Sequence, residues 1–446
     1  MLKLVSTISI LSILILDTSA APGTPGTYVF TLDRRAHRTS SPTLDATNKI
    51  FDSNFAKKEI RSVLSKYQQA PKFLHGVQIS PDRLASAGAK PVDAIPPPKS
   101  VPLDGAPNLA KQATVELTDY MSGTLDVLYY ARMQFGTPAQ TLTIDIDTGS
   151  ADLWVPGGCD SCQTKEFIPS ESTTFHGSSR PFTVFYGTGS VSGHLAQDRV
   201  AMGGLTVDRQ DLGIITSQDD ALAGSPTSGL IGMAFSNVAV SQKPTFFENL
   251  VKGDKLSAEM FSVHLARNQV SGSELCLGCM DMTKAMGPTQ WVPLVSRSYW
   301  AIEVSGIQIM ANATLPVQII AAIDTGTTLI YVPDSIASAL YRSIPGAKPA
   351  DQYGDGFWTY PCSAALNLGF VIDGYAYTIS PSDFNLGHTY ANSPDCVGGI
   401  LSLGDGFPSN FAILGDEFIK SWYTTFDYTD KGHVGFAPSI NNRMGG

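Results

Sequence analysis

Short runs of alternating apolar and polar residues follow one another from Tyr129 onward, and glycine or proline separates them. Alternate side chains of a β-strand point to opposite faces, so this pattern predicts a succession of short strands and turns. Charged residues make up only 16% of the chain, which contains 41 glycines and 28 prolines. This composition favours strands and turns over a helical bundle, and we expect an all-β protein.

The first residues have the pattern of a secretory signal peptide. Lys3 precedes an apolar run, Leu4–Leu16, and small residues precede a cleavage position after Ala20. The run is shorter than the roughly 20 residues that a membrane-spanning helix needs, and Asn441–Gly446 is not a hydrophobic tail. We therefore expect residues 1–20 to be removed. The product would be secreted, or delivered to an acidic vacuole, without a stable membrane anchor.

A basic segment follows the signal. Residues from Pro22 to Lys111 carry more basic than acidic side chains, whereas the whole chain has a formal net charge of −10. Apolar residues at 60, 63 and 64 predict a helix within Phe55–Leu64, and the prolines from Pro91 to Pro107 predict an extended linker. We interpret residues 21–111 as a removable propeptide that is held partly by charge. A flexible tail without function is the alternative.

Size and charge limit the possible functions. A chain of 446 residues can bury a large core and form more than one domain. The acidic net charge provides no field that attracts phosphate groups, so we expect no nucleic-acid partner.

One sequence phrase occurs twice. Ile146–Ser150 reads Ile-Asp-Thr-Gly-Ser and Ile323–Thr327 reads Ile-Asp-Thr-Gly-Thr, and an apolar run ending in proline follows each. A second apolar element with a glycine, Leu230–Gly232 or Ile413–Gly415, follows each copy at a similar distance. An internal duplication is the simplest explanation of both pairs.

The duplication predicts two related β lobes, residues 112–296 and residues 297–446, which can bring the two turns together across a cleft. Each turn presents a carboxylate, Asp147 or Asp324, beside a glycine that lets backbone amides point at the carboxylate oxygens. Two carboxylates a few ångströms apart cannot both ionise cheaply, so they share a proton. One then serves as a base and the other as an acid, which suffices to activate water. A single Asp-Thr-Gly is usually an ordinary turn, but the duplication argues against that reading here.

The chain resembles the pepsin-like aspartic endopeptidases from Leu117 to Pro438. The segments that carry the resemblance are Phe135–Gln140, both Asp-Thr-Gly turns, Tyr186–Ser190, Gly229–Phe235 and Ile413–Asp416. The resemblance implies a bilobal all-β fold, in which two double-psi β-barrel lobes flank a central cleft and the N-terminal lobe carries a flap hairpin. It also implies a monomeric zymogen that cleaves proteins and peptides, prefers large hydrophobic residues, binds pepstatin-type inhibitors and uses no cofactor.

The resemblance assigns a mechanism to the paired turns. Asp147 and Asp324 hold a water molecule; one accepts its proton as it attacks the peptide carbonyl, and the other protonates the oxyanion. The turns would be tied together by two threonines, and hydroxyl groups would bond the outer carboxylate oxygens. The implied supporting residues are Thr148, Gly149, Ser150, Thr325, Gly326 and Thr327.

The flap is the second implied part of the site. Tyr186, Gly187 and Thr188 match the tip of the hairpin that closes over bound peptide. The resemblance implies that the Tyr186 hydroxyl bonds the indole N–H of Trp154, which also suits a buried indole that needs an acceptor.

Asp145 lies two residues before Asp147 and therefore on the same face of a strand. Many relatives have an apolar residue here, beside the pocket for the residue preceding the cleaved bond, whereas some fungal relatives have Asp. We hypothesise a fungal-type enzyme in which Asp145 admits Lys or Arg to that pocket. The alternative is a locally bonded, protonated Asp145 without effect on specificity.

Ser65-Lys66-Tyr67 resembles the inhibitory Lys-Tyr pair of the family's propeptides. Lys66 is thus the candidate for the ammonium that blocks the dyad, with Tyr67 beside it, and Lys57 and Lys58 are competing candidates. Acid would protonate the carboxylates and weaken the attraction, which links activation to pH.

The six cysteines could form three disulfides or, in part, a four-cysteine zinc site. Two Cys-x-x-Cys pairs have zinc-like spacing, but an oxidising compartment favours disulfides, and we expect no metal. The resemblance implies two of the bridges, and we expect the third as a tight local disulfide, with free thiols as its alternative. The pairs are Cys159–Cys162, Cys362–Cys396 and, third, Cys276–Cys279.

Two rival functions also fit parts of the pattern. A glycosidase also uses two carboxylates, but the duplicated turn and the flap argue against it. A pepsin-fold protein that binds peptide or another enzyme without cleaving it is the second rival; both Asp-Thr-Gly turns and Tyr186 are intact here. Asn312 begins the N-glycosylation sequon Asn-Ala-Thr and would be used if it is exposed.

Overall fold

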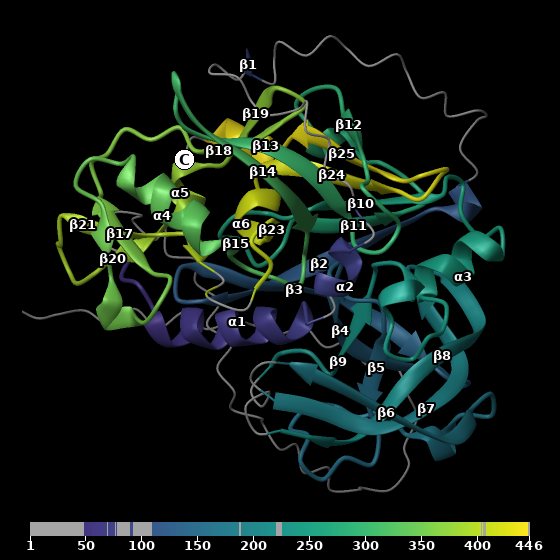
Figure 1. Cartoon of the computed structure of the whole chain (residues 1–446). Helices are drawn as coiled ribbons and strands as arrows, with labels where there is room; N and C mark the ends of the chain where they lie inside the picture. The colour runs from purple at the N-terminus through teal and green to yellow at the C-terminus, as the bar shows by residue number, and fades with distance from the viewer. Residues whose placement is uncertain are drawn as a thin grey trace, which may run out of the picture. The chain divides into compact units, whose positions relative to one another are not determined.

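The strands form three β-sheets in the described part of the computed structural model (Figure 1). The structure describes residues 49–68, 70–75, 77, 90–91, 109–186, 189–219, 225–402, 404 and 407–444. The predicted signal peptide and most of the predicted proline-rich linker lie outside these residues. Among the helices that the structure describes, none is long and apolar enough to cross a membrane.

The largest sheet has 13 strands in the order β12-β25-β24-β10-β11-β2-β3-β4-β9-β5-β8-β7-β6, and it pairs strands of the first half of the chain with β24 and β25 near its end. Its strands are β2 (Ala113–Ser122), β3 (Leu125–Phe135), β4 (Gln140–Asp147), β5 (Leu153–Pro156), β6 (His176–Tyr186), β7 (Gly189–Met202), β8 (Leu205–Gln218), β9 (Gly229–Gly232), β10 (Met260–His264), β11 (Ser273–Leu277), β12 (Gln290–Pro293), β24 (Trp422–Asp427) and β25 (His433–Pro438).

Two further sheets contain the remaining strands. The eight-stranded sheet has the order β1-β19-β18-β13-β14-β23-β15-β22, and the four-stranded sheet has the order β16-β17-β21-β20. Their strands are β1 (Lys90–Pro91), β13 (Ala301–Met310), β14 (Ala313–Ile323), β15 (Ile330–Val332), β16 (Lys348–Pro349), β17 (Trp358–Pro361), β18 (Gly369–Ile372), β19 (Tyr375–Thr378), β20 (Asn385–His388), β21 (Asp395–Gly398), β22 (Ile400–Ser402) and β23 (Phe411–Leu414).

The helices in the described part of the chain are short. The longest is α1, which the side chain of Asp52 caps by accepting hydrogen bonds from the backbone N–H groups of Asn54 and Phe55. The helices are α1 (Ser53–Lys66), α2 (Ala70–Leu74), α3 (Phe246–Lys252), α4 (Asp334–Arg342), α5 (Pro381–Phe384) and α6 (Asp416–Ile419).

The duplicated phrases occupy equivalent places in the two large sheets. β4 ends at Asp147 and pairs in parallel with β9, while β14 ends just before Asp324 and pairs in parallel with β23. The strands after the two turns, β5 and β15, pair antiparallel with β9 and β23. The strand pairing thus repeats the sequence duplication, and the predicted bilobal all-β fold is confirmed.

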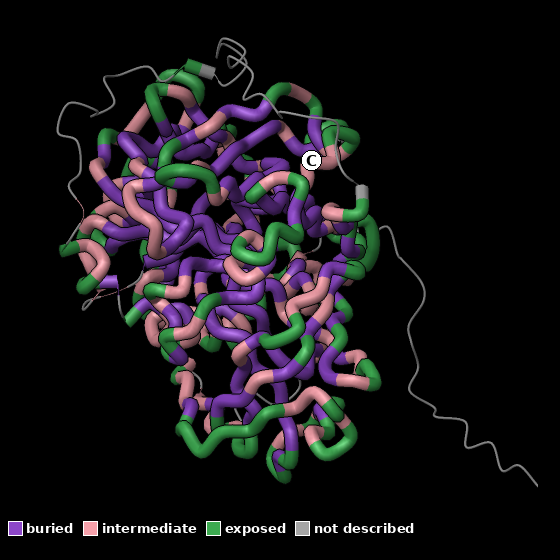
Figure 2. Tube along the Cα trace, turned by 90° about the vertical axis from the view of Figure 1, so that its right-hand side faces the viewer, coloured by how far each residue is buried: buried purple, intermediate pink, exposed green. Residues whose placement is uncertain are grey.

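Apolar side chains from both lobes form a continuous buried core, and Figure 2 shows buried chain in the interior and exposed chain mainly at turns. A second buried cluster joins α1 and α2 to the C-terminal half of the chain. In it, Val63 and Tyr67 are buried with Tyr299, Leu329 and Phe411, and the apolar residues at 60 and 64 pack against them. The predicted helix therefore exists, and its apolar face is covered.

The residues described between 49 and 91, here called the leader, touch the rest of the chain at several separate places. Ile50 forms a parallel bridge with His388, at the edge of the four-stranded sheet. β1 pairs in parallel with β19 at the edge of the eight-stranded sheet. Between these two segments of the leader, α1 lies against β6.

Candidate active site

The two Asp-Thr-Gly turns hold their carboxylates in the same way. Oδ1 of Asp147 accepts a hydrogen bond from the backbone N–H of Gly149 (2.8 Å), and Oδ2 accepts one from the Ser150 hydroxyl (2.6 Å). In the second turn, Oδ1 of Asp324 accepts from the backbone N–H two residues later (2.9 Å) and Oδ2 from the Thr327 hydroxyl (2.5 Å). Both aspartates are buried, so each turn fixes its own carboxylate.

Gly149 and Gly326 allow the two carboxylates to approach each other. A Cβ atom on Gly149 would lie 2.5 Å from the carboxylate carbon of Asp324, and one on Gly326 would collide with the carboxylate of Asp147. Any side chain at either position would push the opposite carboxylate away. The glycines are therefore required by the closeness of the aspartates.

Thr148 and Thr325 tie the turns together by reciprocal hydrogen bonds. The Thr148 hydroxyl donates to the backbone oxygen of Ile323 (2.9 Å) and accepts from the N–H of Thr325 (3.0 Å). The Thr325 hydroxyl donates to the backbone oxygen of Ile146 (2.7 Å) and accepts from the N–H of Thr148 (3.1 Å). Each side contributes the same three atoms, namely the threonine hydroxyl, its backbone N–H and the backbone oxygen two residues earlier, so the two turns form a rigid base under the carboxylates.

The two carboxyl groups have different proton affinities. Burial raises the pKa of Asp147 to about 6; Lys66 opposes this shift, and the charge of Asp324 adds to it. Burial also acts to raise the pKa of Asp324, but the ammonium of Lys66 outweighs it, so the pKa falls below its usual value. Over the pH range between the two pKa values, the pair holds a single proton.

Lys66, at the end of α1, reaches both catalytic candidates. Its ammonium donates to Oδ1 of Asp147 (2.5 Å) and to both oxygens of Asp324 (2.9 and 2.8 Å), and the Tyr67 hydroxyl donates to Oδ2 of Asp324 (3.0 Å). Burial alone would lower the pKa of Lys66, but the two carboxylates raise it by more, so the pKa lies above its usual value and the ammonium stays charged. Lys58, a competing candidate in the sequence, is exposed.

Glu59 is a further leader residue at the site, and no motif marks it in the sequence. Its Oε1 accepts hydrogen bonds from the backbone N–H groups of Thr328 (2.5 Å) and Leu329 (3.0 Å), just beyond the second turn. Burial raises the pKa of Glu59 to about 7, although these N–H groups oppose the shift. Glu59 precedes Lys66 by two helical turns and shares its face, but this spacing alone does not distinguish it from a glutamate that faces solvent. Lys57 lies on a different face of the helix.

Asp145 lies on β4, two residues before Asp147, as the strand prediction required. Its Oδ1 is buried and has no hydrogen-bond partner among the described residues. Burial raises the pKa of Asp145 well above its usual value, and the charge of Asp147 adds to this. A cation beside Asp145 would stabilise the charged form that burial disfavours.

The β6–β7 hairpin supplies the predicted flap. The indole N–H of Trp154 donates to the Tyr186 hydroxyl at 2.8 Å, which is the contact that the resemblance implied. Gly187 and Thr188, the predicted tip residues, lie outside the described residues. The leader also reaches this hairpin, because the Ser65 hydroxyl donates to the backbone oxygen of Phe185 (3.1 Å).

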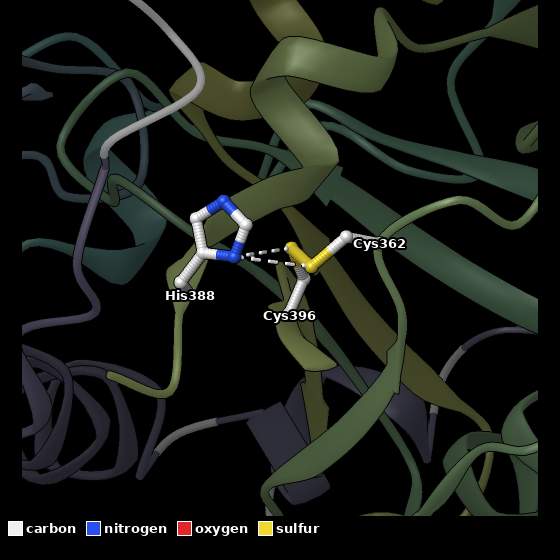
Figure 3. A group of neighbouring side chains, drawn as sticks. All are labelled: Cys362, His388 and Cys396. Carbon is white, nitrogen blue, oxygen red and sulfur yellow. Dashed lines mark hydrogen bonds between the residues drawn. A yellow bond between two sulfur atoms is a disulfide. The ribbon is translucent and has the colours of Figure 1, made fainter. Parts of the chain in front are cut away.

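All six cysteines are paired as predicted. Figure 3 shows His388 beside the Cys362–Cys396 disulfide, with Nδ1 3.4 Å from Sγ of Cys362 and 3.9 Å from Sγ of Cys396. This trio has the composition of a metal site, but the sulfurs are bonded to each other. Nδ1 lies 2.6 Å from the backbone oxygen of Ser393, which can only accept, so Nδ1 carries a proton. The sequon residue Asn312 lies in an exposed turn between β13 and β14.

Comparison with known proteins agrees with this geometry. Residues 128–439 match the eukaryotic aspartyl protease family. The chain is 34% identical to an aspartic protease of Phaffia rhodozyma over 308 residues, covering 68% of this chain and 74% of the relative. It is 34% identical to pepsin A of Suncus murinus over 353 residues (77% and 87%) and 33% identical to cathepsin E of Rattus norvegicus over 335 residues (71% and 81%). The duplicated aspartate turns and these matches together place the chain in the eukaryotic aspartyl protease family, as a pepsin-like aspartic endopeptidase.

Proposed function

We propose that this chain is the zymogen of an acid endopeptidase whose catalytic groups are Asp147 and Asp324. The observation that carries the proposal is the ammonium of Lys66, which donates to both carboxylates. A cation in that position occupies the space that an attacking water needs. A chain organised in this way is latent until the leader moves.

Once Lys66 leaves, the dyad shares one proton and binds a water molecule. The ionised carboxylate takes a proton from the water while the water oxygen forms a bond to the peptide carbonyl carbon. The protonated carboxyl group gives its proton to the carbonyl oxygen, which yields a neutral gem-diol. When this intermediate collapses, the C–N bond breaks, the amide nitrogen receives a proton from the dyad, and the carboxylic acid and amine products separate.

The supporting residues have distinct roles in this reaction. Hydrogen bonds from Gly149, Ser150, Gly326 and Thr327 fix the carboxylate oxygens, so little reorganisation accompanies proton transfer. Thr148 and Thr325 act one step further away, by holding the turns together. Tyr186, oriented by Trp154, would cover bound peptide with Gly187 and Thr188 and exclude water.

Substrate preference is part of the proposal. Large hydrophobic residues would bind beside the dyad, and Asp145 would also admit Lys or Arg, because an ammonium or guanidinium group would pair with its carboxylate. A fungal-type enzyme fits this assignment. Protein and peptide substrates, and inhibitors of the pepstatin type, are the expected ligands.

Secretion and processing complete the proposal. Residues 1–20 would be removed as a signal peptide, and residues 21–111 as a propeptide, to leave a monomeric, two-lobed enzyme that acts outside the cell or in an acidic vacuole. Asn312 would carry a glycan, since its turn is exposed.

The test is cleavage of denatured haemoglobin from pH 3 to 7 by the secreted protein, with and without pepstatin, and with Asp147→Asn as the control. We expect acid-dependent cleavage that pepstatin blocks and the variant lacks. Cleavage that is indifferent to both would exclude the dyad mechanism. A processed, folded protein that cleaves nothing would indicate the binding-only alternative.

A further inference from the structure

The leader begins, within the described residues, as an added strand. The N–H of Phe51 donates to the backbone oxygen of His388 (3.0 Å), and the N–H of His388 donates to the backbone oxygen of Lys49 (2.6 Å). Ile50 and His388 therefore form a parallel pair at β20, the edge strand of its sheet. Removal of the leader would leave one donor and one acceptor of this edge without a partner.

The edge is shaped for a passing backbone. Gly387 has a φ of +125°, a conformation that side chains rarely adopt. A Cβ atom at this position would lie 2.8 Å from the backbone of Lys49, Ile50 and Phe51. The absence of a side chain at Gly387 thus makes room for an extended segment against β20.

An apolar hollow beside the edge receives the next side chain. The ring of Phe51 packs against Tyr353 (centroids 4.9 Å apart) and Phe357 (5.7 Å). Ile50, one residue earlier, is 57% exposed, so the two side chains alternate as in a strand. A cavity of about 90 Å³ continues the hollow between the leader and the rest of the chain. Phe55 lines it from the leader, and Leu125, Leu329 and Leu386 line it from the part that stays when the leader leaves.

We propose that β20 and this hollow form a second peptide-binding site of the activated enzyme, which holds an extended, aromatic-containing segment of the substrate polypeptide. The inference rests on the proposed function, because the site opens only when the leader leaves. A strand-edge pair would give affinity with little sequence demand, and the hollow would select an aromatic residue.

The position of the site relative to the dyad sets the required substrate length. α1 has 14 residues between the strand pair and Lys66, a span of about 21 Å at ~1.5 Å per residue. An extended peptide rises ~3.3 Å per residue. A substrate cut at the dyad would therefore reach the hollow about seven residues from the cleaved bond.

The new N-terminus of a processed chain is an unsuitable occupant. Lys111 bonds Asp254 (2.7 Å), just beyond α3, and Ala113 pairs with Leu277 on β11. Figure 1 shows α3 and β20 on opposite sides of the view. The start of β2 is thus held far from the vacated edge.

The first experiment measures binding by fluorescence anisotropy. A labelled peptide with the sequence of Lys49–Asn54 is added to the activated enzyme, whose dyad is saturated with pepstatin. We expect binding by the activated enzyme, at least tenfold weaker binding of the Phe51→Ala peptide, and no binding by the intact zymogen, where the leader fills the site. Equal binding of both peptides, or no binding by the activated enzyme, overturns the proposal without the need for an enzyme variant.

The second experiment compares a short fluorogenic peptide with versions extended on either side by seven residues that end in Ile-Phe. We expect one extension to lower KM about tenfold, and Gly387→Ala to remove the advantage, whereas Gly374→Ala, at an open turn with φ of +80°, keeps it. Cleavage of the short peptide without any extension advantage overturns the second site but leaves the proposed function intact. A protein that binds the labelled peptide but cleaves neither substrate would overturn the proposed function and leave the second site intact.

Discussion

The backbone N–H of Leu329 donates a 3.0 Å hydrogen bond to Oε1 of Glu59, which lies 270 positions earlier in the chain. This bond and the neighbouring one from Thr328 connect the middle of α1 to the segment directly after the second catalytic turn. The leader is thus attached at Glu59 as well as at Lys66.

Glu59 should make leader binding weaker at neutral pH than its hydrogen bonds suggest. Its pKa rises from 4.5 when free to about 7 in the docked leader, so docking takes up a proton between these values and is favoured as pH falls through 7. Glu59→Gln keeps a hydrogen-bond acceptor but has no ionisable group, so docking of its leader requires no proton uptake at this position. We expect spontaneous activation of Glu59→Gln to be several-fold slower than wild type at pH 7 and similar at pH 4, measured by gel analysis of processing.

Glu59→Ala provides the matched comparison. It leaves the N–H groups of Thr328 and Leu329 without an acceptor in the docked state, which costs about 1–3 kcal/mol. Activation should be faster than wild type at both pH values. If Glu59→Gln were activated faster than wild type at pH 7, the upward shift of the Glu59 pKa on docking would be wrong.

Lys66→Ala should abolish latency at neutral pH. The variant loses the cation between Asp147 and Asp324, so the pair takes up the shared proton of the active dyad and the water site is open. We expect pepstatin-sensitive cleavage at pH 6.5, where the wild-type zymogen is silent, monitored with a fluorogenic peptide. Lys58→Ala changes an exposed lysine of the same helix and should stay latent. A Lys66→Ala protein that remains as intact and silent as the wild type would remove this residue from the inhibitory role.

Asp145→Leu should change specificity more than overall activity. The buried carboxyl group is the proposed partner for a basic substrate residue, so its removal should lower kcat/KM for cleavage after Lys by ~10-fold or more relative to cleavage after Phe. Asp145→Asn keeps the shape and should show the same loss. Peptide pairs that differ only at this residue provide the measurement, and an unchanged Lys-to-Phe ratio would rule out the role.

His264 should limit stability in acid. It is buried on β10, and burial lowers its pKa from 6.5 to about 4, with the charge of Lys284 adding to the shift. As pH falls below 6.5 the unfolded chain takes up a proton that the folded one refuses, so up to about 3 kcal/mol of stability is lost by pH 4. His264→Gln should make the free energy of unfolding less dependent on pH between 6.5 and 4.

The measurement for His264 is the free energy of unfolding in urea at several values between pH 4 and 7. His176→Gln, at an exposed position, is the control and should follow the wild type. A wild-type slope that persists in His264→Gln would assign the effect to other groups.

The parts of the site that repeat in the sequence could be predicted from it. Asp147 and Asp324 were visible because two copies share one pattern, and alternation alone placed Asp145 beside Asp147. Glu59 could not be found in this way, because a glutamate on a helix normally faces solvent and its partners are backbone N–H groups, which have no sequence signature. The pairing of Ile50 with His388 was hidden for the same reason: strand addition depends on backbone atoms and on a glycine whose role is visible only when the segment beside it is known.

The reciprocal bonds of Thr148 and Thr325 have a consequence for how such a molecule could arise. Exchanging the two turns leaves the pattern of donors and acceptors unchanged, which is the property of a contact between identical subunits. An ancestral chain with one lobe would find in a second copy of itself the partners that each lobe finds in its neighbour. Fusion of the two copies into one chain would let the halves diverge. The leader depends on such divergence, because Lys66 and Tyr67 contact the two aspartates unequally. An inhibitory segment with two-fold symmetry could not make these contacts.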